Sequence, residues 1–192
     1  QGCPLNCAWC HNPECISFLP QELFYKERCI GCNKCNEGCY ADARVICGKE
    51  MTAQEIVRIV LQDLPYYKQT GGVTISGGEP FMQSYGTIAL LKECKNRGIT
   101  TVVETCGFAE SSAILNAIPF VDLFLWDVKD TDDERHKKYT GVSNKKILEN
   151  LKLADANGAK TRLRCILING INTTETHYNE ITNIITSLGG CQ

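Results

Sequence analysis

Three cysteines stand close together near the start of the chain. Cys3, Cys7 and Cys10 are separated by three and then by two residues. Three thiolates can hold three of the irons of a cubane cluster, since cysteines are the usual ligands of such clusters. The fourth iron then stays open to a substrate, so this loop is a candidate reaction site. Structural zinc is the alternative, but zinc prefers four ligands in a closed site and no obvious fourth ligand stands nearby.

A second cysteine group has the spacing Cys-x2-Cys-x2-Cys-x3-Cys and consists of Cys29, Cys32, Cys35 and Cys39. This is the bacterial ferredoxin run, although Tyr40 stands where a proline is usual. We therefore expect an auxiliary [4Fe–4S] cluster on the first three cysteines, with Cys39 as its fourth ligand. Cys15 or Cys47 could take that fourth place, and a zinc knuckle is the alternative to a cluster.

The composition is that of a globular protein with many thiols. The chain has 192 residues, a net charge of −2 and 13 cysteines, nine of them between Cys3 and Cys47. A disulfide scaffold would be shorter, so these clustered thiols indicate metal binding in a reducing cytoplasm. The charge gives no basic surface for nucleic acid. No apolar run approaches the ~20 residues of a membrane span, and no signal peptide is visible.

Helix and strand signals alternate after residue 52. Strands are predicted at 73–76, 100–104, 121–128 and 162–168, and helices at 52–64, 86–97, 111–117, 144–156 and 172–189. Capping boxes, Thr52 to Glu55 and Asn172 to Glu175, open the first and last of these helices. Such alternation predicts an α/β fold with parallel strands and right-handed crossovers. Since a closed eightfold barrel needs ~250 residues, we expect a partial barrel or an open sheet.

Residues 15–47 interrupt this alternation. They hold six cysteines, Pro20 and several glycines, and they show neither helical nor strand periodicity. We expect an inserted ferredoxin-like module there. Residues 1–14 and 48–192 would then form the main domain.

Polar residues gather where the predicted strands end. They are Gly77, Gly78 and Glu79 after the first strand, Glu104 and Thr105 at the second, Asp127 and Lys129 at the third, and Arg164 in the fourth. Ligands of parallel sheets lie beyond the carboxyl ends of the strands, so these side chains are candidates for one site. Each also has an ordinary explanation: a glycine turn, a strand-end salt bridge or a surface arginine.

Together these motifs resemble those of the radical S-adenosylmethionine superfamily. The first loop is similar to its cluster loop, including the aromatic Trp9 before the third cysteine. The string from His11 to Glu14, His-Asn-Pro-Glu, is similar to the glycyl-radical-enzyme activating enzymes of the pyruvate formate-lyase activating enzyme type. Members of that family have a strand before the loop and another near the end. We therefore expect a partial radical-enzyme barrel that is truncated at both ends.

The resemblance implies a role for each polar residue. Cys3, Cys7 and Cys10 would hold a site-differentiated [4Fe–4S] cluster that binds S-adenosylmethionine. The implied cofactor contacts are Trp9 beside the nucleotide, Gly77, Gly78 and Glu79 at the methionine ammonium, and Lys129 and Arg164. The implied ligands of a monovalent cation are Glu104, Thr105, Asp127 and the Leu125 carbonyl. Glu104 stands where an aspartate is common, so its reach is one methylene longer.

The implied activity is that of an oxidoreductase of anaerobic metabolism. One electron would cleave S-adenosylmethionine to a 5′-deoxyadenosyl radical, which would take hydrogen from a glycine of a partner such as pyruvate formate-lyase. A flavodoxin- or ferredoxin-type donor would supply the electron. Three rivals remain: a radical enzyme acting on a small molecule or peptide, a non-catalytic iron–sulfur electron carrier, and a zinc-stabilised structural protein. The His-Asn-Pro-Glu string and the single ferredoxin run argue against the first.

The remaining cysteines and histidines belong to no motif. We expect unligated, half-buried thiols at Cys94, Cys106, Cys165 and Cys191. We expect His136 and His177 on the surface.

Overall fold

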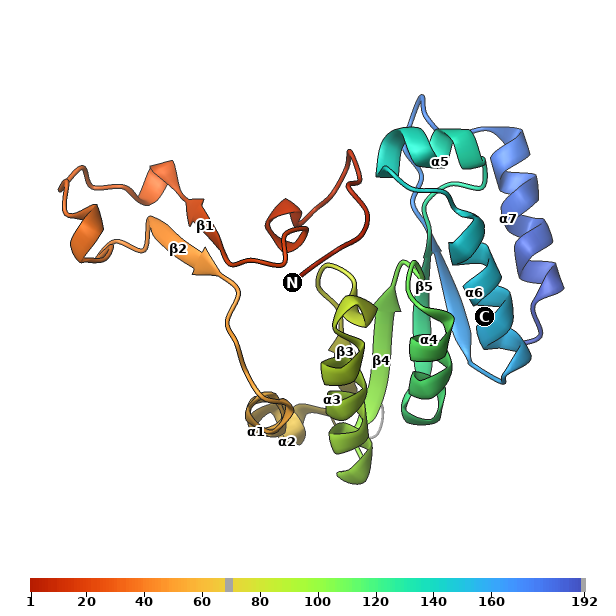
Figure 1. Cartoon of the computed structure of the whole chain (residues 1–192), viewed down its shortest axis with the longest axis horizontal. Coiled ribbons are helices and arrows are strands. Elements are labelled where there is room, and N and C mark those ends of the chain that lie inside the picture. The colour runs from red at the N-terminus through yellow and green to blue at the C-terminus, as the bar shows by residue number, and fades with distance from the viewer. Residues whose placement is uncertain (68–70, 191–192) are drawn as a thin grey trace.

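The computed structural model describes residues 1–67 and 71–190, and its centre is a parallel sheet (Figure 1). The sheet has four strands in the order β3 (Gly72–Ile75), β4 (Thr100–Thr105), β5 (Leu123–Val128) and β6 (Thr161–Cys165). Because the spatial order of the strands is their order in the chain, each connection crosses over by way of helices. The predicted α/β fold with a parallel sheet is confirmed, and each strand boundary lies within three residues of its predicted position.

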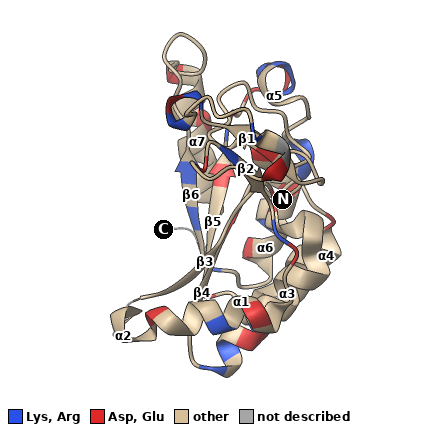
Figure 2. Cartoon of the chain, turned by 90° about the vertical axis from the view of Figure 1, so that its left-hand side faces the viewer, with Lys and Arg blue, Asp and Glu red and all other residues tan. Residues whose placement is uncertain are grey.

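Seven α-helices are described: α1 (Ala53–Val60), α2 (Leu64–Tyr67), α3 (Ser84–Asn96), α4 (Ser111–Ala117), α5 (Asp133–Thr140), α6 (Lys145–Ala156) and α7 (Glu175–Ser187). The 3₁₀ turns among the described residues are η1 (Pro13–Cys15), η2 (Lys26–Arg28), η3 (Cys35–Glu37), η4 (Leu61–Asp63), η5 (Pro80–Gln83) and η6 (Ile118–Phe120). None of these helices is both long enough and apolar enough to cross a membrane. Acidic and basic residues are intermixed on the elements visible in Figure 2.

The main hydrophobic core lies between the sheet and the helices α3, α4 and α6. Phe124 and Trp126 of β5 are fully buried there against Leu91, Ile114 and Leu151. Successive side chains of a strand point to opposite faces. The residues that alternate with Phe124 and Trp126 therefore face away from this core. Glu104, Asp127 and Arg164 lie on that opposite face, whereas Thr105, which is paired with Trp126, lies on the core side.

Two helix starts differ in their outcome. The predicted capping box of α1 is confirmed: the Thr52 backbone amide donates to Glu55 at 2.7 Å, and the Glu55 amide donates to the Thr52 hydroxyl at 3.2 Å. The predicted cap at Asn172 is wrong, because Thr174 accepts from the His177 amide and caps α7 instead. Asn172 is buried and holds neighbouring loops, a role that local spacing does not reveal.

Helix α5 was not predicted, because its sequence is strongly polar and carries no apolar stripe. Its ends do carry signals. The Asp132 side chain accepts from the Arg135 amide at 2.7 Å, and Gly141 ends the helix in the left-handed conformation at φ 83°. Both are frequent capping arrangements.

The prediction that both histidines lie on the surface is wrong. His136 and His177 are each 1% exposed. The His136 ring lies 2.7 Å from the Val142 carbonyl, and the His177 ring lies 2.8 Å from the Thr131 hydroxyl. Burial lowers the pKa of both rings. Buried polar rings usually have a hydrogen-bond partner. The partner of His177 Nδ1 is 46 residues away in the sequence, and its buried Nε2 has no partner among the described residues.

The segment 15–47 contains strands that its sequence did not suggest. The strands β1 (Gln21–Phe24) and β2 (Arg44–Cys47) pair antiparallel, with Gln21 opposite Cys47. They are too short and too exposed to show a two-residue hydrophobic period. Figure 1 shows this ribbon extending from the N-terminal loop, away from the parallel sheet.

Truncation of the core helix α3 should lower stability strongly. Leu91 is fully buried, so Leu91→Ala should cost about 2–5 kcal/mol of unfolding free energy. Tyr85 lies on the same helix and is 93% exposed, so Tyr85→Ala should change stability by less than about 0.5 kcal/mol. Urea unfolding of the metal-free protein, followed by tryptophan fluorescence, measures both. Equal losses would contradict the placement of the core.

Candidate active site

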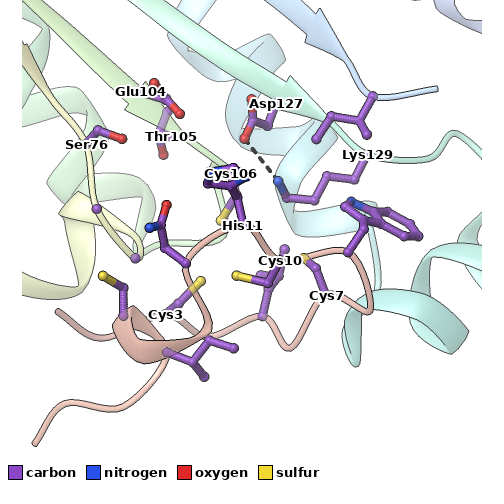
Figure 3. Close-up of a pocket in the computed structure, with 18 of the residues that line it drawn as sticks. Cys3, Cys7, Cys10, His11, Ser76, Glu104, Thr105, Cys106, Asp127 and Lys129 are labelled. Carbon is purple, nitrogen blue, oxygen red and sulfur yellow. Dashed lines mark hydrogen bonds and ion pairs between the residues drawn. The ribbon is translucent and has the colours of Figure 1, made fainter. Parts of the chain in front are cut away.

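One pocket lies between the N-terminal cysteine loop and the carboxyl ends of the strands (Figure 3). Its volume is about 190 Å³. Eleven of the twelve residues predicted for the reaction site line it: Cys3, Cys7, Trp9, Cys10, Gly77, Gly78, Glu104, Thr105, Asp127, Lys129 and Arg164. Residues that are 161 positions apart in the sequence therefore share one cavity.

Backbone hydrogen bonds hold the cysteine loop against the rest of the chain. The Asn6 and Ala8 amides each donate at 2.8 Å, to the carbonyls of Thr140 and Tyr139 at the end of α5. Leu5, between Cys3 and Asn6, is 1% exposed and anchors the loop. The end of α5, a helix that was not predicted, thus holds the cysteine loop in place, and Figure 1 shows the helix next to the loop.

The glycine after β3 permits a close backbone approach. A Cβ atom on Gly78 would lie 2.3 Å from the Gly2 carbonyl oxygen and 2.6 Å from the Cys15 carbonyl oxygen. No side chain fits at such distances, so glycine is required there. The Glu79 amide donates to the same Gly2 carbonyl at 2.8 Å. The glycine motif therefore sets how closely the cysteine loop approaches the strand ends.

Glu79 is the one predicted contact that does not line this pocket. It is 2% exposed and accepts from the Phe81 amide, the Thr105 hydroxyl and the Cys106 amide at 3.1, 2.8 and 2.7 Å. Burial raises the pKa of its carboxyl, while these hydrogen bonds act in the opposite direction. In the structure Glu79 connects the end of β4 to η5, and its contact with the methionine ammonium stays a prediction.

The charged residues of the pocket form one network. Arg164 donates to Asp127 at 2.7 Å and to Glu104 at 2.7 Å, and Lys129 donates to Asp127 at 3.0 Å. Burial lowers the pKa of Lys129, but the Asp127 carboxylate and the Cys7 and Cys106 thiols together raise it above its usual value. Two cations and two carboxylates therefore stand together without net charge.

The predicted ligands of a monovalent cation are engaged within the protein. Asp127 and Glu104 form ion pairs with Arg164, and the Thr105 hydroxyl donates to Glu79. A cation bound by these groups would have to displace those partners. The structure brings the group together but does not establish the cation site.

Cys3 and Cys7 hold their thiol protons more tightly than ordinary cysteines do. Burial raises the pKa of Cys7 to about 11, although the nearby Lys129 lowers it, and burial also raises the pKa of Cys3. Metal binding must therefore release protons here. Ligand atoms on one zinc ion stay within roughly 4.6 Å of one another, given bonds of ~2.3 Å. Among the described residues, the group of three or more ligand atoms within 4.8 Å of one another does not include these sulfurs, so they are not arranged around a single zinc ion.

The ferredoxin-type cysteines surround a second, small cavity of about 50 Å³. Its lining includes Cys29, Cys32, Cys35 and Cys39, together with Phe24 of β1 and Arg44 of β2. The Ala43 amide donates to the Cys39 sulfur at 3.3 Å. Cys15 and Cys47 do not line this cavity and lie beside each other elsewhere. This geometry favours Cys39 as the fourth member of the group.

Several residues of the main pocket were missed by sequence reasoning. Ser76, Cys106 and Ile166 line it from the strand ends, and His11 and Asn12 line it from the loop. Ser76 and Cys106 adjoin predicted motifs, so strand-end position could have found them. Of the cysteines expected to be half-buried, Cys94 and Cys106 are buried and Cys165 is intermediate, whereas Cys191 lies outside the described residues.

The chain is similar to known proteins along most of its length. A family model described as the Radical SAM superfamily matches residues 1–181. The chain is 35% identical over 226 residues to the isethionate sulfite-lyase activating enzyme of Nitratidesulfovibrio vulgaris, covering 98% of this chain and 74% of that protein. It is 35% identical over 208 residues to the choline trimethylamine-lyase activating enzyme of Oleidesulfovibrio alaskensis, covering 91% and 67%.

A solved structure agrees with these sequence matches. A domain of a pyruvate-formate lyase-activating enzyme from Bacteroides vulgatus is 30% identical to this chain and superposes with a TM-score of 0.58. The match covers 61% of this chain and 73% of that one. The family expected from the motifs is thus confirmed. This chain belongs to the radical S-adenosylmethionine superfamily and, within it, to the activating enzymes of glycyl radical enzymes.

Proposed function

We propose that this chain installs a glycyl radical on a partner enzyme, using a [4Fe–4S] cluster on Cys3, Cys7 and Cys10 together with S-adenosylmethionine. The observation that carries the proposal is the shared pocket, in which three closely spaced thiols face the charged strand-end network. When bound, the cluster and S-adenosylmethionine supply a reductive cleavage that yields an oxidant able to take hydrogen from carbon. The relatives named above are activating enzymes of partner lyases, which supports a protein as the substrate.

The pocket's own groups suit a zwitterionic ligand. The methionine part of S-adenosylmethionine carries one ammonium and one carboxylate. Lys129 and Arg164 can orient the carboxylate, because both cations lie at the pocket and are already held by Asp127. The backbone at Gly77 and Gly78 can accept from the ammonium, because glycine leaves its carbonyls accessible. The paired cations and carboxylates of the pocket can exchange partners with the ammonium and carboxylate of the ligand, so no unpaired charge is left buried.

Trp9 belongs with the nucleotide in this proposal. It lines the pocket directly before Cys10, and its ring lies 5.8 Å from that of Tyr139 on α5. Its buried indole nitrogen has no hydrogen-bond partner among the described residues. Aromatic rings provide flat apolar surfaces on which bases stack. Trp9 would thus define one wall of the nucleotide subsite.

Three further assignments belong to the same proposal. Cys29, Cys32, Cys35 and Cys39 hold an auxiliary [4Fe–4S] cluster, supported by their common cavity. A monovalent cation binds at Glu104, Thr105 and Asp127 once their internal pairs open. A flavodoxin- or ferredoxin-type protein delivers electrons in an anaerobic cytoplasm, where thiol-ligated clusters persist.

The two cysteine groups should differ in their effect on catalysis. Cys7→Ala removes one of only three ligands of the reaction-site cluster, so it should abolish formation of 5′-deoxyadenosine. Cys32→Ala removes a ligand of the auxiliary cluster and should reduce the yield only partly. Anaerobically reconstituted protein with dithionite and S-adenosylmethionine, analysed by chromatography, measures the product. A normal yield of 5′-deoxyadenosine from Cys7→Ala would contradict the proposed cluster site. Absence of the product with the wild-type protein would contradict the radical activity itself.

Asp127 should matter for cofactor binding more than for folding. Asp127→Asn removes the common carboxylate of Lys129 and Arg164, so S-adenosylmethionine should bind about tenfold more weakly, a loss of about 1.4 kcal/mol. Asp122→Asn is the matched control, because Asp122 pairs with Lys95 at the opposite ends of the strands. Equilibrium dialysis against labelled cofactor reports binding, and circular dichroism reports folding. Equal affinity in both variants would contradict the assigned subsite.

A further inference from the structure

A third group of ligand atoms lies at the edge of the main pocket, where Cys15, which also lines that pocket, meets Cys47. Among residues 1–67 and 71–190, the ligand atoms of Glu14, Cys15 and Cys47 all lie within 4.8 Å of one another. All three residues are half-buried. Cys15 ends η1 beside the cysteine loop, and Cys47 is the last residue of β2. The group therefore joins two segments that are separated by 31 residues of chain.

The distances select a single ion over a cluster. Bonds of about 2.0–2.3 Å to one zinc ion keep its sulfur and oxygen ligands within roughly 4.6 Å of each other. The three atoms of this group need almost no movement to meet that limit. The cysteines of the two cluster sites, among the described residues, form no group of three within that range.

The backbone around the group is already held in place. The Gln1 side-chain amide donates to the Glu14 carbonyl at 3.1 Å and to the Cys47 carbonyl at 3.0 Å. The Cys15 amide donates to the Asn12 carbonyl at 3.0 Å, and the Cys15 carbonyl accepts from the Gly2 amide at 2.9 Å. The Asn12 side chain also donates to one Glu14 carboxylate oxygen at 3.0 Å, which orients that ligand. Such support is typical of metal ligands whose geometry is set in advance.

The donor types indicate which ion the group would take. Two thiolates and a carboxylate suit zinc, which is borderline-soft and accepts sulfur and oxygen. Calcium and magnesium prefer all-oxygen sites and are disfavoured by the thiols. Water can supply the fourth position. Binding would release the two thiol protons to solvent, without any change of oxidation state.

We propose that Glu14, Cys15 and Cys47 bind one zinc ion that fastens the end of β2 to the segment beside the cysteine loop. The ion would act as a structural link. It lies where residues 15–47 rejoin the main part of the chain, so it would fix the ferredoxin-type cysteines relative to the reaction pocket. This proposal does not depend on the proposed function.

The test uses the full chain with its clusters reconstituted, so that the cluster cysteines are occupied. One equivalent of zinc chloride is added anaerobically, unbound metal is removed, and zinc and iron are counted by elemental analysis. X-ray absorption at the zinc edge then counts sulfur ligands. We expect one zinc per chain with two sulfur ligands. Cys15→Ser and Cys47→Ser should each lose that zinc and keep the iron content of the wild type.

Two glutamate variants test the site without changing a cysteine. Glu14→Gln should weaken zinc binding by at least ~10-fold, since even indirect partners of a metal contribute that much. Glu50→Gln, an exposed glutamate three residues after Cys47, should leave the affinity unchanged. This pair keeps the proposal testable if the cysteine variants fail to fold.

Three outcomes would overturn the proposal. Four sulfur ligands around zinc would place the ion in a cluster site. Equal zinc content in Cys47→Ser and in the wild type would exclude Cys47 as a ligand. Loss of iron in Cys15→Ser or Cys47→Ser would show that these thiols serve an iron–sulfur cluster instead.

Discussion

The candidate active site depends on the close approach of two backbone segments. Gly78, after β3, lies so near the carbonyls of Gly2 and Cys15 that a single added carbon would collide with both. The Glu79 amide donates to Gly2 at the same point. This contact brings the cysteine loop to the ends of parallel strands, where side chains from several strands converge. A residue larger than glycine would move the thiols away from the charged residues at the strand ends.

The strand ends contribute charge in a balanced form. Lys129 and Arg164 share Asp127, and Arg164 also binds Glu104. Paired charges tolerate partial burial far better than single ones, because each supplies the other's lost solvation. The arrangement keeps two cations at the pocket while the opposite face of β5 is packed with Phe124 and Trp126. The strand's two-residue period thus separates chemistry from the core.

The segment that carries the second cysteine group contributes little to that core. Its strands β1 and β2 are mostly exposed, and its four cysteines surround a cavity of their own. A small module without a core usually needs a metal or a cross-link for stability. Metal binding by the cysteines of residues 15–47 would therefore stabilise the fold of this segment. Where that segment meets the cysteine loop, Gln1 already bridges Glu14 and Cys47.

The sequence by itself determined the chemistry and most of the fold. The spacing of Cys3, Cys7 and Cys10 is local, and so is the alternation of apolar strands with capped helices. Eleven of twelve predicted site residues line one pocket because parallel strands end at the same edge. Those features depend on neighbours along the chain or on rules that hold for every parallel sheet.

Only the tertiary structure decided how these residues are held. Helix α5 supports the cysteine loop although its polar sequence shows no amphipathic face. Glu79 turns into the protein because its carboxyl accepts hydrogen bonds from Thr105 and Cys106. These partners are 26 and 27 residues away in the sequence. The buried His177 ring likewise has its partner, the Thr131 hydroxyl, 46 residues away in the sequence. A hydrogen bond depends on positions in space, and local sequence patterns carry no information about partners that meet only after the chain has folded.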